Sequence, residues 1–200
     1  MRPVLVALAV SALALTAACN RKSETAEAPA PAAAPPPAPV APEPAVEAPG
    51  GFQHQAKFDA SGYYMAENIQ TGAYRLNHIA IGAPSDFSQW EQGKRASVFG
   101  PILFQFDDLN SPTVTNEMGG EAHAVTVRLL PEAYSVAPGK MTFKGSDPKL
   151  GQVLFSGTFD EAALAQAKAE GASTGPVLRG VLKVGNAPAR PVALNYFVGE

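Results

Sequence analysis

The stretch from Ala26 to Gly50 limits where this chain of 200 residues can fold. It contains ten alanines, nine prolines, three glutamates, two valines and one glycine, with no aromatic residue. Such a composition lacks the large apolar side chains that a core requires, and its prolines favour an extended, polyproline-like chain. At about 3.1 Å per residue, the stretch reaches at most roughly 80 Å. We therefore expect a tether over residues 19–50 and one globular domain over residues 51–200.

Apolar and polar residues alternate through most of this domain, which is the pattern of half-buried β-strands. The ranges that show it are 74–82, 101–108, 123–130, 140–145, 151–159, 176–185 and 190–199, and 62–67 and 133–136 add two short strands. Three of these strands place their apolar residues on one face. The expected core therefore includes Ile102, Phe104, Phe106, Val125, Val127, Leu129, Val192, Leu194, Tyr196 and Val198.

Two helices are expected between the strands. Ser85 can cap a helix over residues 86–92, which places Phe87 and Trp90 on one side and ends near Gly93. Asp160 can cap a second helix that begins at Glu161, buries Leu164 and ends at Gly171. The strands are separated by Gly, Pro, Asn and Asp turns and do not alternate regularly with helices. This order predicts a mainly β fold, an antiparallel β-sandwich or barrel of about seven to nine strands with one or two short helices.

The amino terminus has the pattern of a signal peptide. One charged residue, Arg2, precedes sixteen uncharged and mostly small apolar residues, Pro3 to Ala18. This run is shorter than the roughly 20 residues that cross a bilayer, so we do not expect a permanent transmembrane helix. Residues 1–18 are therefore predicted to be a signal peptide.

The residues Leu15-Thr16-Ala17-Ala18-Cys19 resemble the lipobox of bacterial lipoproteins, with Thr16 where the commonest form carries leucine. The resemblance implies that a diacylglyceryl group is attached to the Cys19 sulfur, that cleavage occurs just before Cys19, and that the new amino terminus receives a palmitate-type acyl chain. Because Asn20 follows, and not the aspartate that marks inner-membrane retention in enteric bacteria, it implies the periplasmic face of the outer membrane. The alternative is an incidental cysteine near an ordinary signal-peptidase site.

Charge and cysteine content exclude several classes of protein. Residues 51–200 carry twelve Lys and Arg against fourteen Asp and Glu, without clustering of either sign. A nucleic-acid partner, which requires a basic stripe, is therefore not expected. Cys19 is the only cysteine, so its acylation leaves no thiol for a disulfide, a nucleophile or a metal site.

Several oxygen-bearing side chains between residues 107 and 121 could in principle bind calcium: Asp107, Asp108, Asn110, Glu117 and Glu121. Their spacing matches no EF-hand loop, and the residues Asp-Asp-Leu-Asn-Ser-Pro are typical of a turn after a strand. We therefore expect a turn and no bound metal here.

The histidines are His54, His78 and His123. His78 and His123, together with Glu121, would form a metal site if their strands pair, but no short-range spacing supports one and we expect structural roles. No serine lies in a Gly-x-Ser-x-Gly elbow, and the pair Gly119-Gly120 precedes a strand, not the helix that a phosphate loop requires. We therefore expect neither an enzyme nor a cofactor.

The range Gly180 to Tyr196 resembles the closing hairpin of the periplasmic YceI-type barrels, in which a strand, a glycine turn and an Arg/Lys-Pro-Val-x-Leu strand follow in that order. That family holds isoprenoid lipid in an apolar lumen. The resemblance covers under a tenth of the chain and does not extend to the family's early histidine-containing strand.

Two functions are therefore considered. The first is a membrane-anchored, non-catalytic β domain that binds an envelope protein or other component, or serves in envelope assembly. The alternative is a carrier of a small apolar ligand or lipid, in which phenylalanines would line a cavity in place of filling the core: Phe99, Phe104, Phe106, Phe143, Phe155 and Phe197.

Overall fold

The computed structural model describes residues 44–115 and 119–199. The chain divides into two units between Val40 and Ala41, and all described residues lie in the second. These residues form a ten-stranded sheet, a two-stranded sheet and two α-helices. The elements are β1 (Phe52–His54), β2 (Gly62–Thr71), β3 (Tyr74–Ile81), α1 (Pro84–Glu91), β4 (Ile102–Asp108), β5 (Thr113–Thr115), β6 (Glu121–His123), β7 (Thr126–Leu129), β8 (Ala133–Ala137), β9 (Lys140–Asp147), β10 (Gly151–Phe159), α2 (Glu161–Glu170), β11 (Ala172–Val184) and β12 (Arg190–Phe197).

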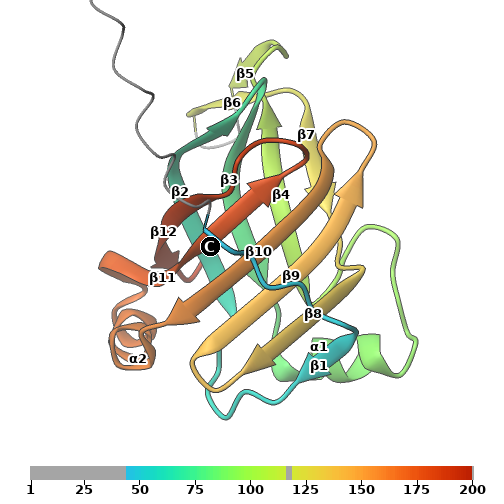
Figure 1. Cartoon of the computed structure of the whole chain (residues 1–200). Helices are drawn as coiled ribbons and strands as arrows, with labels where there is room; N and C mark the ends of the chain where they lie inside the picture. Colours follow the sequence, from blue (N-terminus) through green and yellow to red (C-terminus); the bar gives the residue numbers. More distant parts are fainter. Residues whose placement is uncertain (1–43, 116–118, 200) are drawn as a thin grey trace, which may run out of the picture. The chain divides into compact units, whose positions relative to one another are not determined.

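The large sheet has the strand order β1-β8-β9-β10-β11-β12-β2-β3-β4-β7. It curls, so that β8 to β11 form one wall and β2, β3, β4 and β7 form the wall behind them (Figure 1). Near one edge, the Glu132 backbone N–H donates to the Lys144 carbonyl at 2.8 Å, which brings the chain after β7 against β9. Neighbouring strands of this sheet are antiparallel, except that β1 pairs with β8 in parallel. The mainly β, barrel or sandwich class predicted from the sequence is confirmed.

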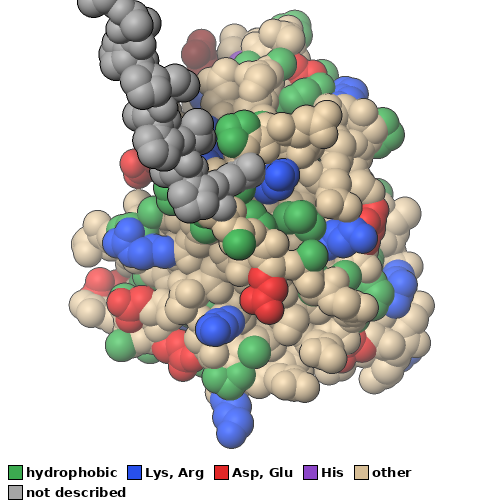
Figure 2. Space-filling model, in the orientation of Figure 1, with side chains coloured by type: hydrophobic (Ala, Val, Ile, Leu, Met, Phe, Trp, Pro, Cys, Tyr) green, Lys and Arg blue, Asp and Glu red, His purple; other side chains and the backbone are tan. Residues whose placement is uncertain are grey.

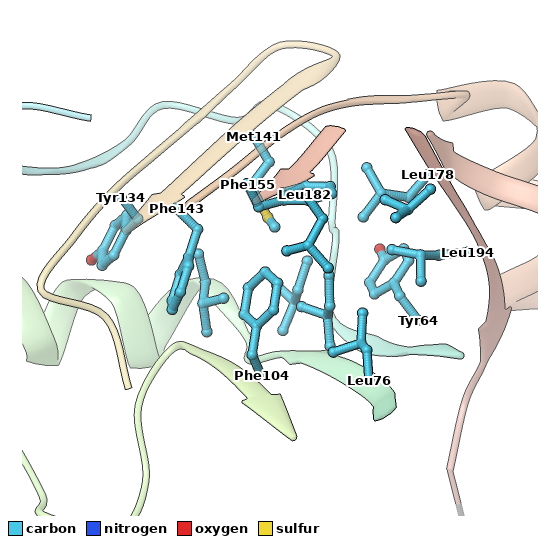
Figure 3. Packing of buried hydrophobic residues seen from close by; sticks show 14 of the residues in the cluster. Tyr64, Leu76, Phe104, Tyr134, Met141, Phe143, Phe155, Leu178, Leu182 and Leu194 are labelled. Carbon is cyan, nitrogen blue, oxygen red and sulfur yellow. The ribbon is translucent and has the colours of Figure 1, made fainter. Parts of the chain in front are cut away.

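The interior of the curled sheet is filled by side chains. Rings and aliphatic groups from both walls point toward one another, among them Phe104, Phe143, Phe155 and Leu182 (Figure 3). The rings of Phe104 and Phe143 are stacked with centroids 4.2 Å apart. All four of these residues are almost completely buried. Phe104, Phe106, Phe143 and Phe155 therefore belong to the core, and only Phe99 and Phe197 of the six candidate rings lie at the surface.

Most of the predicted core residues are buried, but two are not. Val125 is exposed because β7 begins one residue later, and Val198 is exposed because it follows the last residue of β12. The range predicted as one strand over 123–130 contains the end of β6 and all of β7. Strands β1, β5 and β6 were not predicted, because three residues are too few for alternation to show.

Both predicted helices are present, and the first begins earlier than expected. Ala83, not Ser85, is the N-cap residue of α1, and the Asp86 carboxylate accepts a hydrogen bond from the Ala83 backbone N–H at 2.8 Å. Pro84 at the first helical position explains this start, since its φ suits a helix and it has no N–H to satisfy. In α2, Asp160 accepts from the Ala163 N–H at 3.0 Å and Gly171 ends the helix in the left-handed conformation, as predicted.

Charged side chains of both signs are interspersed on the face seen in Figure 2. Within the described ranges, no helix combines the length and apolar character needed to cross a bilayer.

Candidate functional site

A hollow of about 370 Å³ lies where β2 begins and where β3 and β12 end. Its apolar lining includes Tyr63, Ile81, Phe99, Tyr196 and Val198. These residues come from the adjacent strands β12, β2 and β3, from the residues just after β12, and from the segment that leads from α1 to β4. The strand order therefore brings most of them together. We refer to this feature as the Tyr63 hollow.

Close backbone packing at Gly62 shapes one wall of the hollow. Gly62 has a φ of +133°, and a Cβ atom built on it would overlap the Tyr196 ring. A side chain at this position would therefore meet both backbone strain and a steric clash. Glycine lets the Tyr196 ring approach the backbone. The adjacent Tyr63 lies on the outer face of β2 and is 40% exposed.

Lys168 of α2 forms the polar part of the lining. Its Nζ donates to the Ser61 carbonyl at 2.7 Å and to Ser61 Oγ at 3.1 Å, and it forms an ion pair with Asp59 Oδ2 at 3.1 Å. Three oxygens thus surround an ammonium group that has three hydrogens to donate. Because its charge is paired, Lys168 ties α2 to the loop before β2, and the hollow presents a mainly apolar surface.

Exposed apolar side chains occur in the lining of the Tyr63 hollow and at residues next to the lining in the chain. Val98 is 70% exposed, Phe99 56% and Val198 52%, and Phe197, which lies opposite Tyr63 across β12 and β2, is 37% exposed. We call Tyr63, Val98, Phe99, Phe197 and Val198 the apolar rim. Single exposed apolar residues are common, but a group of them around a hollow is typical of an interaction site.

A polar cluster adjoins the rim on the same face of the sheet. Asp107 of β4 is 4% exposed, and it is the only polar or charged residue among those described that is classed as buried. Its carboxylate accepts from Arg75 Nη2 at 3.1 Å and from Asn77 Nδ2 at 3.0 and 3.2 Å. Asn77 Oδ1 lies 2.9 Å from His78 Nδ1, and the His78 ring contacts Tyr63 edge-on at 5.2 Å.

The residues considered for metal binding from the sequence are dispersed. Asp107 pairs with Arg75, and Asp108 accepts from the Asn110 N–H at 3.1 Å, which is the predicted turn. His123 Nδ1 lies 3.4 Å from the Ser111 carbonyl. Glu117 and Cys19 lie outside the described residues. Within residues 44–115 and 119–199, no three His, Cys, Asp or Glu side chains are placed to hold a metal ion together.

The remaining histidine has a packing role. The His54 ring of β1 stacks on Phe87 of α1 with centroids 4.1 Å apart. Burial lowers the pKa of His54, and the charge of Glu91 partly offsets that effect. His54 therefore helps to hold α1 against β1.

Sequence reasoning did not identify the Tyr63 hollow as a site. Tyr63 and Tyr196 were assigned to strands, and Phe99 and Phe197 were considered only as lining for an interior cavity. The available signal was the alternation in residues 62–67, where Tyr63 and Met65 fall on the face opposite Tyr64, but it does not tell which face is buried.

The hairpin of β11 and β12 is present, with Leu182 opposite Arg190 and a turn that contains Gly185 at a φ of +55°. Comparisons with protein-family models, with curated proteins and with solved structures give no match for this chain.

Proposed function

We propose that this chain is a lipid-anchored binding protein of the bacterial envelope, whose β domain binds an apolar segment of another envelope protein through the apolar rim and the Tyr63 hollow. The observation that carries the proposal is the gathering of exposed aromatic and aliphatic side chains around the hollow. Tyrosine and phenylalanine are enriched in the buried centres of protein interfaces, where their rings contribute much of the binding energy.

The surroundings of the hollow favour binding over catalysis. Its one charged lining residue, Lys168, is paired with Asp59 and bonded to Ser61, so it offers no free acid or base. The proposed anchor at Cys19 and the tether would keep the domain near the membrane and raise its effective concentration for partners there. We therefore propose a non-catalytic role on the periplasmic face of the outer membrane.

Site-specific photo-crosslinking in the host tests this proposal. A benzoylphenylalanine at position 99 is expected to give a discrete adduct with an envelope protein. The matched control is the same group at Lys149, an exposed residue in the turn between β9 and β10, at the other end of the strands. The proposal fails if position 99 gives no adduct, or if both positions capture the same set of proteins.

A carrier of a small apolar ligand is the second candidate, and the volume of the hollow favours it, since ligand sites usually occupy about 300–1,000 Å³. The rings of Phe104, Phe143 and Phe155 fill the interior of the sheet, so a ligand would bind in the hollow and not in the interior. Native mass spectrometry of protein purified from its host distinguishes the two functions. A reproducible lipid adduct that Phe99→Ser removes supports the carrier, whereas an adduct-free mass supports the first proposal.

A further inference from the structure

Met65 and His78 lie directly opposite each other on β2 and β3. Their inward-facing neighbours in the register, Tyr64 and Ile79, are fully buried, so Met65 and His78 occupy the outer face. Met65 is 36% exposed. Side chains that face each other on antiparallel strands have Cβ atoms about 4.5–5.5 Å apart, so a thioether and an imidazole here can contact one small ligand.

The tautomer of His78 follows from the hydrogen bonds behind it. Asp107, paired with Arg75, is a carboxylate that only accepts, so the Asn77 group facing it at 3.0 Å is the NH₂ group. The Asn77 oxygen then faces His78 Nδ1 at 2.9 Å, and this oxygen also only accepts. His78 therefore carries its proton on Nδ1, and the lone pair of Nε2 is available.

A β-bulge creates this arrangement. The register of β3 against β4 shifts between Leu76 and His78, so Asn77 is an extra residue without a direct partner on β4. The bulge places the Asn77 amide between Asp107 and His78, so that this one side chain is hydrogen-bonded to both. In a regular ladder, the consecutive residues Asn77 and His78 would point to opposite faces of the sheet. Bulges of this kind re-aim side chains and occur often beside functional sites.

We propose that His78 Nε2 and the Met65 sulfur form a binding site for a soft monovalent metal ion of the copper(I) class. A thioether and an imidazole are the neutral ligands that such an ion prefers, and two of them suffice for a linear site. A metal-binding histidine typically donates its other ring N–H to an oxygen that is itself held in place. Here the Asn77 oxygen accepts from His78 Nδ1, and Asp107 holds the Asn77 amide in place.

The surrounding charges oppose a monovalent ion less than a divalent one. The charges that act on His78 are Asp107 and Arg128, and Arg75 is paired with Asp107. Burial lowers the pKa of His78, the charge of Asp107 raises it and that of Arg128 lowers it, and the net direction is down. Because Arg128 is unfavourable in proportion to the charge of a nearby cation, a monovalent ion is opposed less than a divalent one.

Titration with silver(I), a redox-stable substitute for copper(I), tests the site. The full chain is used in a Cys19→Ser background, which removes the competing thiol. Nitrogen-15 spectra of the imidazoles report on His54, His78 and His123 during the titration. Carbon-13 spectra of the methionine methyl groups report on Met65 in the same titration. We expect saturable shifts of His78 Nε2 and of the Met65 methyl group at one equivalent, and smaller or later shifts for His54 and His123.

Three variants distinguish the site from general affinity for the metal. Met65→Leu and His78→Gln are each expected to weaken binding at least about tenfold, and Asn77→Leu about tenfold by releasing the imidazole from its orientation. Met141→Leu, in the buried core, is the matched control and should bind as the parent does. The proposal is overturned if His78 does not shift first, or if Met65→Leu binds silver(I) with unchanged affinity while its circular dichroism spectrum shows a folded chain.

Discussion

Gly62 lies against the edge of the Tyr196 ring, with no room for a Cβ atom between them. We expect Gly62→Ala to lower the free energy of unfolding by about 2–4 kcal/mol, because alanine meets both this contact and an unfavourable φ of +133°. Urea unfolding measures the change. Gly175→Ala is the control, since a Cβ atom there meets nothing within 4 Å, and it should change stability by less than about 0.5 kcal/mol. Equal effects would show that the Gly62 contact is not tight.

Phenylalanines in the interior and on the apolar rim should respond differently to truncation. Phe143→Ala removes a fully buried ring that stacks on Phe104, and we expect a loss of about 3–5 kcal/mol in unfolding free energy. Phe99→Ala removes a ring that is 56% exposed, and should cost less than about 0.5 kcal/mol while weakening the proposed partner binding. Thermal and urea unfolding measure both. A large loss of stability in Phe99→Ala would assign that ring to the core.

The ion pair between Asp59 and Lys168 should make a pH-dependent contribution to stability. Burial raises the pKa of Asp59, but hydrogen bonds from Ser61 and Lys168 and the charge of Lys168 lower it, and the net direction is down from 3.8. A carboxylate with a depressed pKa stabilises the fold above its unfolded pKa, and that stability is lost as the pH falls through the folded pKa.

We therefore expect Asp59→Asn to be less stable than the parent at pH 7, by under about 1 kcal/mol because the pair is partly exposed. The difference in melting temperature should shrink as the pH falls below 3.8 and through the depressed pKa of Asp59. A difference that stays constant over this range would mean that Asp59 is not the titrating group.

The proposed anchor predicts a covalent change at Cys19. Cys19→Ser should leave the precursor uncleaved and unlabelled by a palmitate analogue in the host, because a hydroxyl does not form the thioether linkage. The urea unfolding midpoint of the domain should not change, since a proline-rich tether transmits no packing strain. An unlabelled parent chain, or an intermolecular disulfide at Cys19, would remove the anchor and the localisation from the proposal.

The fold class could be predicted because strand periodicity is a local property. Ile102, Phe104 and Phe106 are buried as their alternation predicts, and Asp160 and Gly171 bound α2 through contacts within a few residues. The prediction was wrong for Val125 and Val198, where a strand begins later or ends earlier than the apolar pattern. A strand ends where the neighbouring strand no longer pairs with it. The apolar pattern of one segment does not show where that neighbouring strand begins or ends.

The sequence by itself determined that the fold is mainly β, because alternation, turn residues and helix caps act over short distances. Only the tertiary structure decided that Tyr63, Phe99 and Tyr196 line one hollow, and that Asp107 lies behind Asn77 and His78. These groups are brought together by strand order, a β-bulge and the curl of the sheet. All three depend on pairing between segments that are far apart in the chain, so the proposed binding surfaces are properties of the assembled sheet.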